Sequence, residues 1–138
     1  MKIAKEIYRQ ITTQSFLKEV SGLLGGINGT ILYYYQASSN NNRECSCYLE
    51  GERINKVIDL WQRKGIDFYG IYHTHPICDE RLSAQDISYI TAVMNALSQN
   101  VECLYFPVIL PNKKMTAYKA VNKGQISIVK ETVIQIDL

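Results

Sequence analysis

Hydrophobic residues recur along this chain at two spacings. Steps of three and four residues, which place apolar side chains on one face of a helix, predict amphipathic helices over residues 3–14, 52–64 and 83–99. Shorter apolar runs, rich in β-branched and aromatic residues, predict strands before, between and after these helices. The predicted strands cover residues 19–25, 30–35, 45–50, 66–75, 101–110, 115–121 and 125–136, the last with a short terminal helix as its alternative.

The order of these elements indicates a single domain over residues 1–138. Gly25–Gly29 has the composition of a turn, so the strands on either side of it are expected to form a hairpin. Residues 36–44 are polar and rich in Ser and Asn, which is typical of a surface loop. Strands distributed in this way among helices predict an α/β fold, in which a mixed β-sheet is flanked by helices.

Composition narrows the classes of function. With 138 residues, 46% hydrophobic and 20% charged, the chain is long enough and apolar enough to bury a core. A net charge of +2 without a cluster of Lys or Arg gives no reason to expect nucleic acid or an acidic membrane surface as a partner. No apolar run reaches the ~18 residues of a membrane span and no signal-peptide core is present, so we expect a cytoplasmic protein. The four cysteines show no Cys-x-x-Cys spacing, and free thiols are expected at Cys45, Cys47, Cys78 and Cys103.

Candidate chemistry concentrates around Gly70–Pro76. The two histidines of the chain, His73 and His75, lie two residues apart near the end of a predicted strand. They therefore face the same side, with backbones roughly 6.6 Å apart, close enough for both imidazoles to bind one small cation. Ser83 and Asp86 follow in the Ser-x-x-acid pattern of a helix N-terminus. A carboxylate on that first turn would complete a two-His-one-carboxylate site with one position open to water, as in catalytic zinc sites.

Each piece alone also has a plain structural explanation, such as an ordinary capping box at Ser83 and Asp86. The complete string, His-x-His-Pro, six residues, Ser, two residues and Asp, resembles the signature of the JAB/MPN-type metalloproteases, often called JAMM proteins. Upstream, Glu19-Val-Ser-Gly-Leu-Leu-Gly25 resembles the glutamate and glycine-rich strand of the same family, while Thr74 stands where a Ser is often found. The resemblance covers residues 19–86 and implies the JAB/MPN fold, a cytidine-deaminase-like α/β architecture.

The resemblance also implies a reaction and a role for each residue. His73, His75 and Asp86 would bind one catalytic Zn²⁺. Glu19 would carry a proton from the zinc-bound water to the leaving amine, and Ser83 would donate a hydrogen bond to the oxyanion. Family members with the whole motif resemble one another in cleaving peptide or isopeptide bonds after the C-terminal glycine of ubiquitin or a ubiquitin-like protein. The implied partner is therefore such a protein, with its tail in an extended conformation.

Several alternatives stay open at this point. The substrate could be ubiquitin, a prokaryotic ubiquitin-like modifier or a sulfur-carrier protein of the same fold. A non-catalytic MPN scaffold would hold partners in a complex, although such members usually lack the metal residues. RadC-like proteins share a similar string but typically continue with Ser-Gly where this chain has Ile77-Cys78. A zinc nucleoside deaminase would need a His-x-Glu and Pro-Cys-x-x-Cys signature, which the sequence lacks.

Overall fold

The computed structural model of the chain describes residues 1–13, 19–37, 48–97 and 101–138. The helices in this part of the chain are α1 (Lys5–Thr12), α2 (Gly51–Arg63) and α3 (Ala84–Ala96). Its strands are β1 (Lys2–Ala4), β2 (Ser21–Ile27), β3 (Thr30–Gln36), β4 (Asp67–Thr74), β5 (Cys103–Tyr105), β6 (Val108–Ile109), β7 (Met115–Asn122), β8 (Ile126–Glu131) and β9 (Ile134–Ile136).

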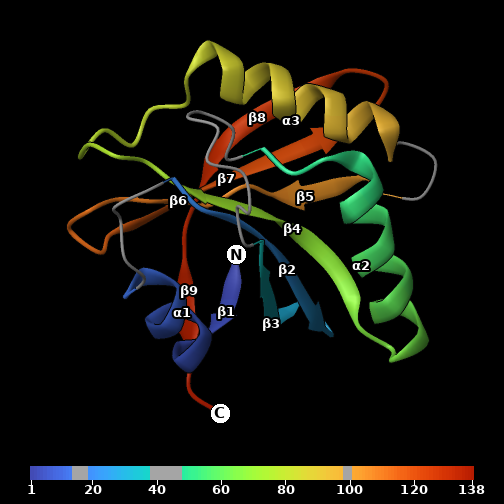
Figure 1. Cartoon of the computed structure of the whole chain (residues 1–138), viewed down its shortest axis with the longest axis horizontal. Coiled ribbons are helices and arrows are strands. Elements are labelled where there is room, and N and C mark those ends of the chain that lie inside the picture. Colours follow the sequence, from blue (N-terminus) through green and yellow to red (C-terminus); the bar gives the residue numbers. More distant parts are fainter. Residues whose placement is uncertain (14–18, 38–47, 98–100) are drawn as a thin grey trace.

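Within the described residues, the strands form one mixed sheet in the order β5-β7-β6-β4-β2-β3-β1-β9, and β8 pairs with β7. The central strand β4 is antiparallel to β2 and parallel to β5 and β6. Only Thr132 and Val133 connect β8 to β9, although β9 lies at the opposite end of the sheet order. The amino group of Met1 at the start of β1 donates to the Thr132 carbonyl at 2.8 Å. The sheet therefore curls so that the segment after β8 lies beside the start of β1, and the two chain termini lie at β1 and β9 (Figure 1).

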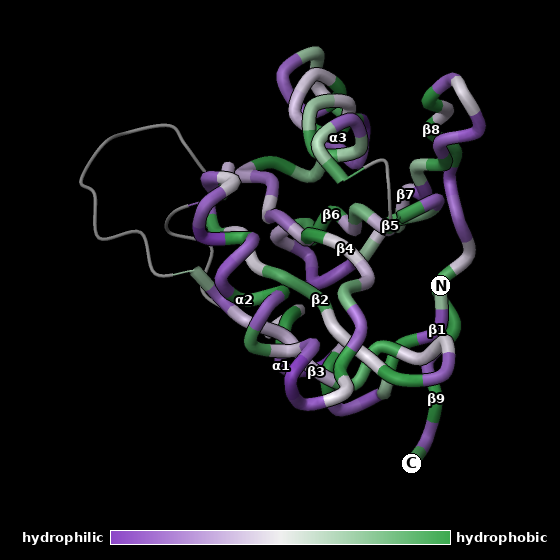
Figure 2. Tube along the Cα trace, turned by 90° about the vertical axis from the view of Figure 1, so that its right-hand side faces the viewer, coloured by the Kyte–Doolittle hydropathy of each residue, from purple (hydrophilic) through white to green (hydrophobic). Residues whose placement is uncertain are grey.

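The helices cover the two faces of this curled sheet (Figure 1). One core packs α2 and α3 on strand residues such as Leu23 and Ile71. The other core packs α1 on Leu24 and Tyr72, each of which comes directly after one of those residues in its strand. Polar and apolar stretches follow one another along α2 in Figure 2, as a helix with one apolar face predicts. The expected mixed sheet flanked by helices is confirmed. Because side chains alternate along a strand, the position of a site residue in its strand decides on which face of the sheet its side chain lies.

None of the helices in the described residues is long and apolar enough to cross a membrane.

The hairpin between β2 and β3 is confirmed, and its turn is shorter than the glycine-rich stretch indicated. Strand β2 continues to Ile27, and the chain reverses at Asn28 and Gly29, whose φ angles are 54° and 84°. Two successive residues with positive φ make the tight turn that matches the twist of paired strands. At its other end, β2 begins at Ser21, which pairs with His73 near the end of β4.

Three sequence-based boundaries were wrong. The helix expected from residue 3 starts at Lys5, because Ile3 is a fully buried strand residue that pairs with β3 and β9. The strand expected over 101–110 divides into β5 and β6 on either side of Pro107, which has no N–H to donate. The strand expected over 125–136 divides into β8 and β9, and no terminal helix forms there.

One further expectation falls partly outside the described residues. The strand predicted over 45–50 includes residues 45–47, which are not described, and residues 48–50 are not in a strand. Most of the loop predicted over 36–44 is likewise outside, since Gln36 ends β3 and the described chain stops at residue 37 before resuming at 48.

Gly70 provides a test of how tightly β4 is held. A Cβ atom there would overlap the backbone carbonyl of Tyr105 in the neighbouring strand β5. We expect Gly70→Ala to lower the free energy of unfolding by about 2–3 kcal/mol, because one of the two strands must move. Urea denaturation at equilibrium measures the change.

The matched control is Gly51→Ala at the start of α2, where an added Cβ meets nothing within 4 Å. This variant should be neutral or up to about 1 kcal/mol more stable. Equal stability of the two variants would contradict the close approach of β4 and β5.

Candidate metal centre

Strand β4 presents the two histidines at its end. His73 pairs with Ser21 of β2, and the N–H of His75 donates to the Ile109 carbonyl at 2.9 Å, so the backbone stays tied to its neighbours beyond Thr74. Because side chains alternate along a strand, both rings lie on the face that carries α3. Their Nε2 atoms are 3.0 Å apart. The prediction that both imidazoles lie on one face is therefore confirmed.

The first turn of α3 supplies a third side chain to the same place. Ser83 is the N-cap: its Oγ accepts the Asp86 N–H at 3.0 Å, and its own N–H donates to Asp86 Oδ2 at 2.9 Å. This capping box directs the Asp86 carboxylate back toward β4. Asp86 Oδ1 lies 3.3 Å from His73 Nε2, and Oδ2 lies 3.3 Å from His75 Nε2. The structure thus brings together His73, His75 and Asp86, the residues expected to bind a metal.

The donor set fits a metal ion. The Asp79 carbonyl, which can only accept, lies 2.7 Å from His75 Nδ1, so this nitrogen carries a hydrogen and Nε2 is the nitrogen that faces the group. Tetrahedral ligands at bond lengths of about 2.0–2.1 Å lie about 3.3–3.4 Å from one another. The separations of 3.0 and 3.3 Å among the three candidate ligand atoms are close to that value. Two imidazole nitrogens and one carboxylate oxygen are also the atoms that catalytic zinc sites use.

Asp86 is ionised in this setting, although it is only 4% exposed. Burial acts to raise its pKa, but hydrogen bonds from the His73 side chain and the Ser83 N–H outweigh burial. Together with the Tyr48 hydroxyl, they hold the pKa of Asp86 well below its usual range. The carboxylate is therefore already in the charged form that binds a cation, and no proton has to be displaced from it at neutral pH.

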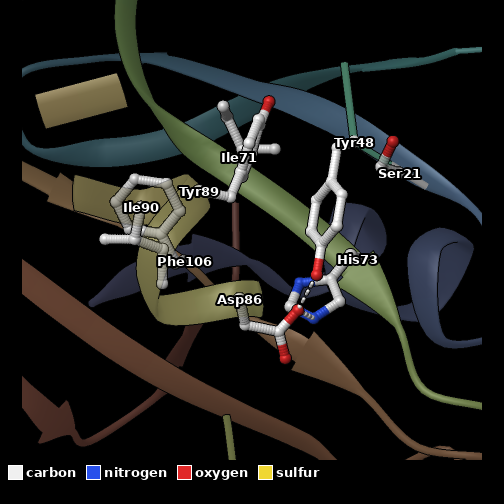
Figure 3. A pocket seen from close by; sticks show the side chains of 8 residues that line it. All are labelled: Ser21, Tyr48, Ile71, His73, Asp86, Tyr89, Ile90 and Phe106. Carbon is white, nitrogen blue, oxygen red and sulfur yellow. Dashed lines mark hydrogen bonds and ion pairs between the residues drawn. The ribbon is translucent and has the colours of Figure 1, made fainter. Parts of the chain in front are cut away.

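Tyr48 is a member of the site that the sequence did not indicate. Its hydroxyl donates to Asp86 Oδ1 at 2.7 Å, as Figure 3 shows. Its ring packs on Tyr89 of α3, with centroids 4.7 Å apart and planes inclined by 30°. Tyr48 lies 38 residues from Asp86 and belongs to none of the recognisable motifs. Its only sequence signal was an aromatic residue in a stretch that was expected to be a strand.

A small cavity lies behind the group (Figure 3). At about 10 Å³ it has room for roughly one water molecule. Its walls are mostly apolar and are formed by Ser21, Tyr48, Ile71, His73, Asp86, Tyr89, Ile90 and Phe106.

The loop between β4 and α3 is anchored to the sheet through Glu80. The Glu80 carboxylate accepts from Thr116 Oγ1 at 2.7 Å and forms an ion pair with Lys130, and its carbonyl accepts from the Tyr118 hydroxyl at 2.7 Å. Hydrogen bonds from Lys130 and then from Thr116 lower the pKa of Glu80 to about 2. The neighbouring residue is Asp79, whose carbonyl orients one of the imidazoles. Contacts to β7 and β8 therefore fix the loop beside the site.

The two expected catalytic residues, Glu19 and Ser83, are both exposed. Ser83 touches the group directly through the capping box. Glu19 precedes Val20, which accepts the Thr74 N–H at 2.9 Å and donates to Thr74 Oγ1 at 2.7 Å. The chain at Glu19 thus still runs beside the end of β4. Among the described residues, Glu19 is not one of the three side chains that converge on a common point.

Comparison with known proteins identifies the fold. No protein-family model and no curated protein matches the sequence. Among solved structures, a protein of Desulfitobacterium hafniense has a TM-score of 0.70 at 17% identity, with 99% of this chain and 93% of that chain covered. A protein of Salinibacter ruber has a TM-score of 0.61 at 18% identity, with 99% and 92% covered. A JAB1/MPN domain protein of Archaeoglobus fulgidus has a TM-score of 0.57 at 16% identity, with 98% and 100% covered.

The chain therefore has the JAB/MPN fold that its motifs implied. At these identities the likeness establishes the arrangement of helices and strands and nothing finer. What the side chains add is the group of two histidines and one aspartate, which is compatible with the metal site of a JAMM-type protein.

Replacing the carboxylate tests whether the group binds metal. Loss of a residue that only hydrogen-bonds to a metal ligand typically lowers metal affinity about 10–100-fold. We expect Asp86→Asn to weaken Zn²⁺ binding by more than this, because the charged ligand itself is lost. Isothermal titration of the purified protein with Zn²⁺, supported by elemental analysis, measures this. The control is Asp79→Asn, whose side chain contacts Arg81 while its backbone carbonyl stays in place. Wild-type affinity in Asp86→Asn would exclude the group as a metal site.

Proposed function

We propose that the protein is a zinc-dependent peptidase or isopeptidase that cleaves after the C-terminal glycine of a ubiquitin-like protein. The observation that carries the proposal is the convergence of His73, His75 and Asp86 within a JAB/MPN fold. Two imidazoles and one carboxylate leave one position of a tetrahedral ion open, which is the arrangement of catalytic rather than structural zinc. The resemblance of the surrounding motif supplies the class of reaction.

Bound at these three ligands, zinc would lower the pKa of a water molecule to about 7 and polarise the substrate carbonyl. The chain's own residues then have three tasks. The imidazole of His75 is held through Nδ1 by the Asp79 carbonyl, which leaves Nε2 to face the ion. The capping box holds the Asp86 carboxylate in place. The apolar wall behind the group limits the entry of bulk water from that side.

Glu19 is the proposed proton carrier. Val20 beside it is hydrogen-bonded to Thr74, and the β2–β4 register, extended by one residue, would put Glu19 across from His75 on the same face of the sheet. An exposed carboxylate at this place can accept a proton from the attacking water and deliver it to the departing amine nitrogen. An amide needs this second transfer because an unprotonated amine is a poor leaving group.

Ser83 is the proposed donor to the oxyanion. Its oxygen already accepts the N–H of Asp86, and a hydroxyl oxygen can accept while its hydrogen points elsewhere. The residue is exposed at the start of α3, so this hydrogen is available to a substrate carbonyl oxygen. Loss of one such donor typically costs about 10²–10³ in rate.

A protein substrate is supported by the surface around the site. Ile77 is 65% exposed and Ile87 is 45% exposed, and each lies within two residues of a proposed metal ligand. Ile87 also lines an apolar groove of about 460 Å³ between α3 and β8, together with Leu82, Ile126 and Ile128. Exposed apolar surface next to a reactive site is expected where a folded partner docks. Free thiols at Cys78 and Cys103 suit a reducing, cytoplasmic setting, which stays part of the proposal.

A panel of substrates tests the function. Zinc-loaded protein is incubated with ubiquitin, prokaryotic ubiquitin-like modifiers and sulfur-carrier proteins, each fused or isopeptide-linked to a reporter after its terminal glycine. We expect cleavage of at least one member immediately after that glycine, shown by mass spectrometry and abolished by a chelator. Binding of a panel member without cleavage would favour the non-catalytic scaffold and overturn the enzyme assignment. Which member is cleaved distinguishes a modifier-removing enzyme from one that processes a sulfur carrier.

The role of Glu19 is tested with the best substrate of that panel. We expect Glu19→Gln to bind zinc as the wild type does and to lose about 10²–10⁴ in turnover, since an amide cannot carry the proton. Glu102→Gln, at an exposed glutamate before β5, serves as the control and should keep full activity. Near-normal turnover in Glu19→Gln would remove this residue from the mechanism.

A further inference from the structure

The Asp86 carboxylate is held by the protein at both of its oxygens. The Ser83 N–H donates to Oδ2 at 2.9 Å, and the Tyr48 hydroxyl donates to Oδ1 at 2.7 Å. Hydrogen bonds to an ionised acceptor are stronger than those between neutral groups. Two of them, arriving from different elements, fix both the position and the rotation of the carboxylate plane. The capping box alone would fix only one of the two oxygens.

Tyr48 is itself fixed by contacts with α3. Its ring packs on that of Tyr89, which lies three residues after Asp86 and therefore on the same side of the helix. The Tyr89 hydroxyl donates to the carbonyl of Leu49 at 2.9 Å, and the Leu49 side chain is 7% exposed. The segment that carries Tyr48 is thus attached to Tyr89 of α3 twice, through the ring of Tyr48 and through the carbonyl of Leu49. A hydroxyl held in this way can impose an orientation on its acceptor.

We propose that Tyr48 is a positioning residue for the metal ligand Asp86. Its hydroxyl holds Oδ1 so that the carboxylate meets the bound cation in one orientation, and the fourth position of the ion stays open for water. The inference rests on the proposed zinc-dependent function. It adds a residue to the site that belongs to neither half of the sequence motif. If Tyr48 only filled space, its ring would serve equally well without the hydroxyl.

Tyr48→Phe is the direct test, because it removes the hydroxyl and keeps the ring. We expect Zn²⁺ affinity to fall about 10–100-fold, as it does when the hydrogen-bond partner of a metal ligand is removed. Competition with a chromophoric chelator measures this affinity. We also expect the visible absorption bands of the Co²⁺-loaded variant to differ from those of the wild type, since these bands report the geometry of the ligands.

Tyr69→Phe is the matched control. The Tyr69 hydroxyl also makes one hydrogen bond of 2.7 Å, in this case with the Gly29 N–H at the hairpin turn between β2 and β3. Its loss should leave metal affinity and the Co²⁺ spectrum unchanged. Thermal unfolding of both variants without metal shows that each is folded at the temperature of the binding measurement. A Tyr48→Phe variant with affinity within threefold of the wild type and an unchanged spectrum would overturn the proposal.

These measurements separate the two inferences. Both readouts concern metal binding, so they succeed or fail whether or not a substrate is found. If Tyr48→Phe binds zinc weakly and no ubiquitin-like protein is cleaved, Tyr48 keeps its role and the peptidase assignment fails. If cleavage is found and Tyr48→Phe binds zinc like the wild type, the peptidase stands and the positioning role is wrong.

Discussion

The site depends on one carboxylate that two elements share. Asp86 completes the capping box that starts α3 through Oδ2, and its two oxygens each lie 3.3 Å from one of the imidazoles at the end of β4. Helix start and metal-binding group are therefore joined in one buried residue. A buried carboxylate is costly unless hydrogen bonds and positive charge compensate it. The Ser83 N–H and the Tyr48 hydroxyl provide part of this compensation, and a bound cation would provide the rest.

The surrounding fold keeps that carboxylate and the histidines from drifting apart. β4 is held between β2 and β6, and α3 packs on the same sheet through its apolar face. The loop that connects β4 to α3 would be the least firmly held part of the site, because loops have fewer backbone contacts than strands. Glu80 offsets this weakness by tying the loop to Thr116 and Lys130, strand residues that are distant in sequence. The imidazole that hydrogen-bonds to the loop at Asp79 is therefore oriented from β7 and β8 as well as from β4.

The parts of the site that follow local rules could be predicted from the sequence. His73 and His75 share a face because strands alternate, and Ser83 and Asp86 face each other because a capping box spans three residues. The parts that depend on distant partners could not. Ile3 fits a helical spacing but pairs with β9 at the far end of the chain, and Tyr48 meets Asp86 across 38 residues. The break at Pro107 lies between these cases, since a proline inside a strand pattern is itself a local signal.

The same distinction separates fold from chemistry. Solved structures at 16–18% identity reproduce the course of the strands and helices, but the fold alone does not distinguish a peptidase from a scaffold. The argument for a metal ion rests on the free-energy cost of burying these polar side chains. His73 and Asp86 are buried and their side chains are close together, where well-packed apolar residues would often give equal or greater stability. Asp86 also caps α3, so part of this cost has a structural return, and the convergence of both histidines on the same carboxylate is what is compatible with a metal ion. Under the proposed metal-binding role, the hydrogen bond from Tyr48 to the same carboxylate has a clear use, because a carboxylate shared between a helix cap and an ion benefits from a fixed orientation.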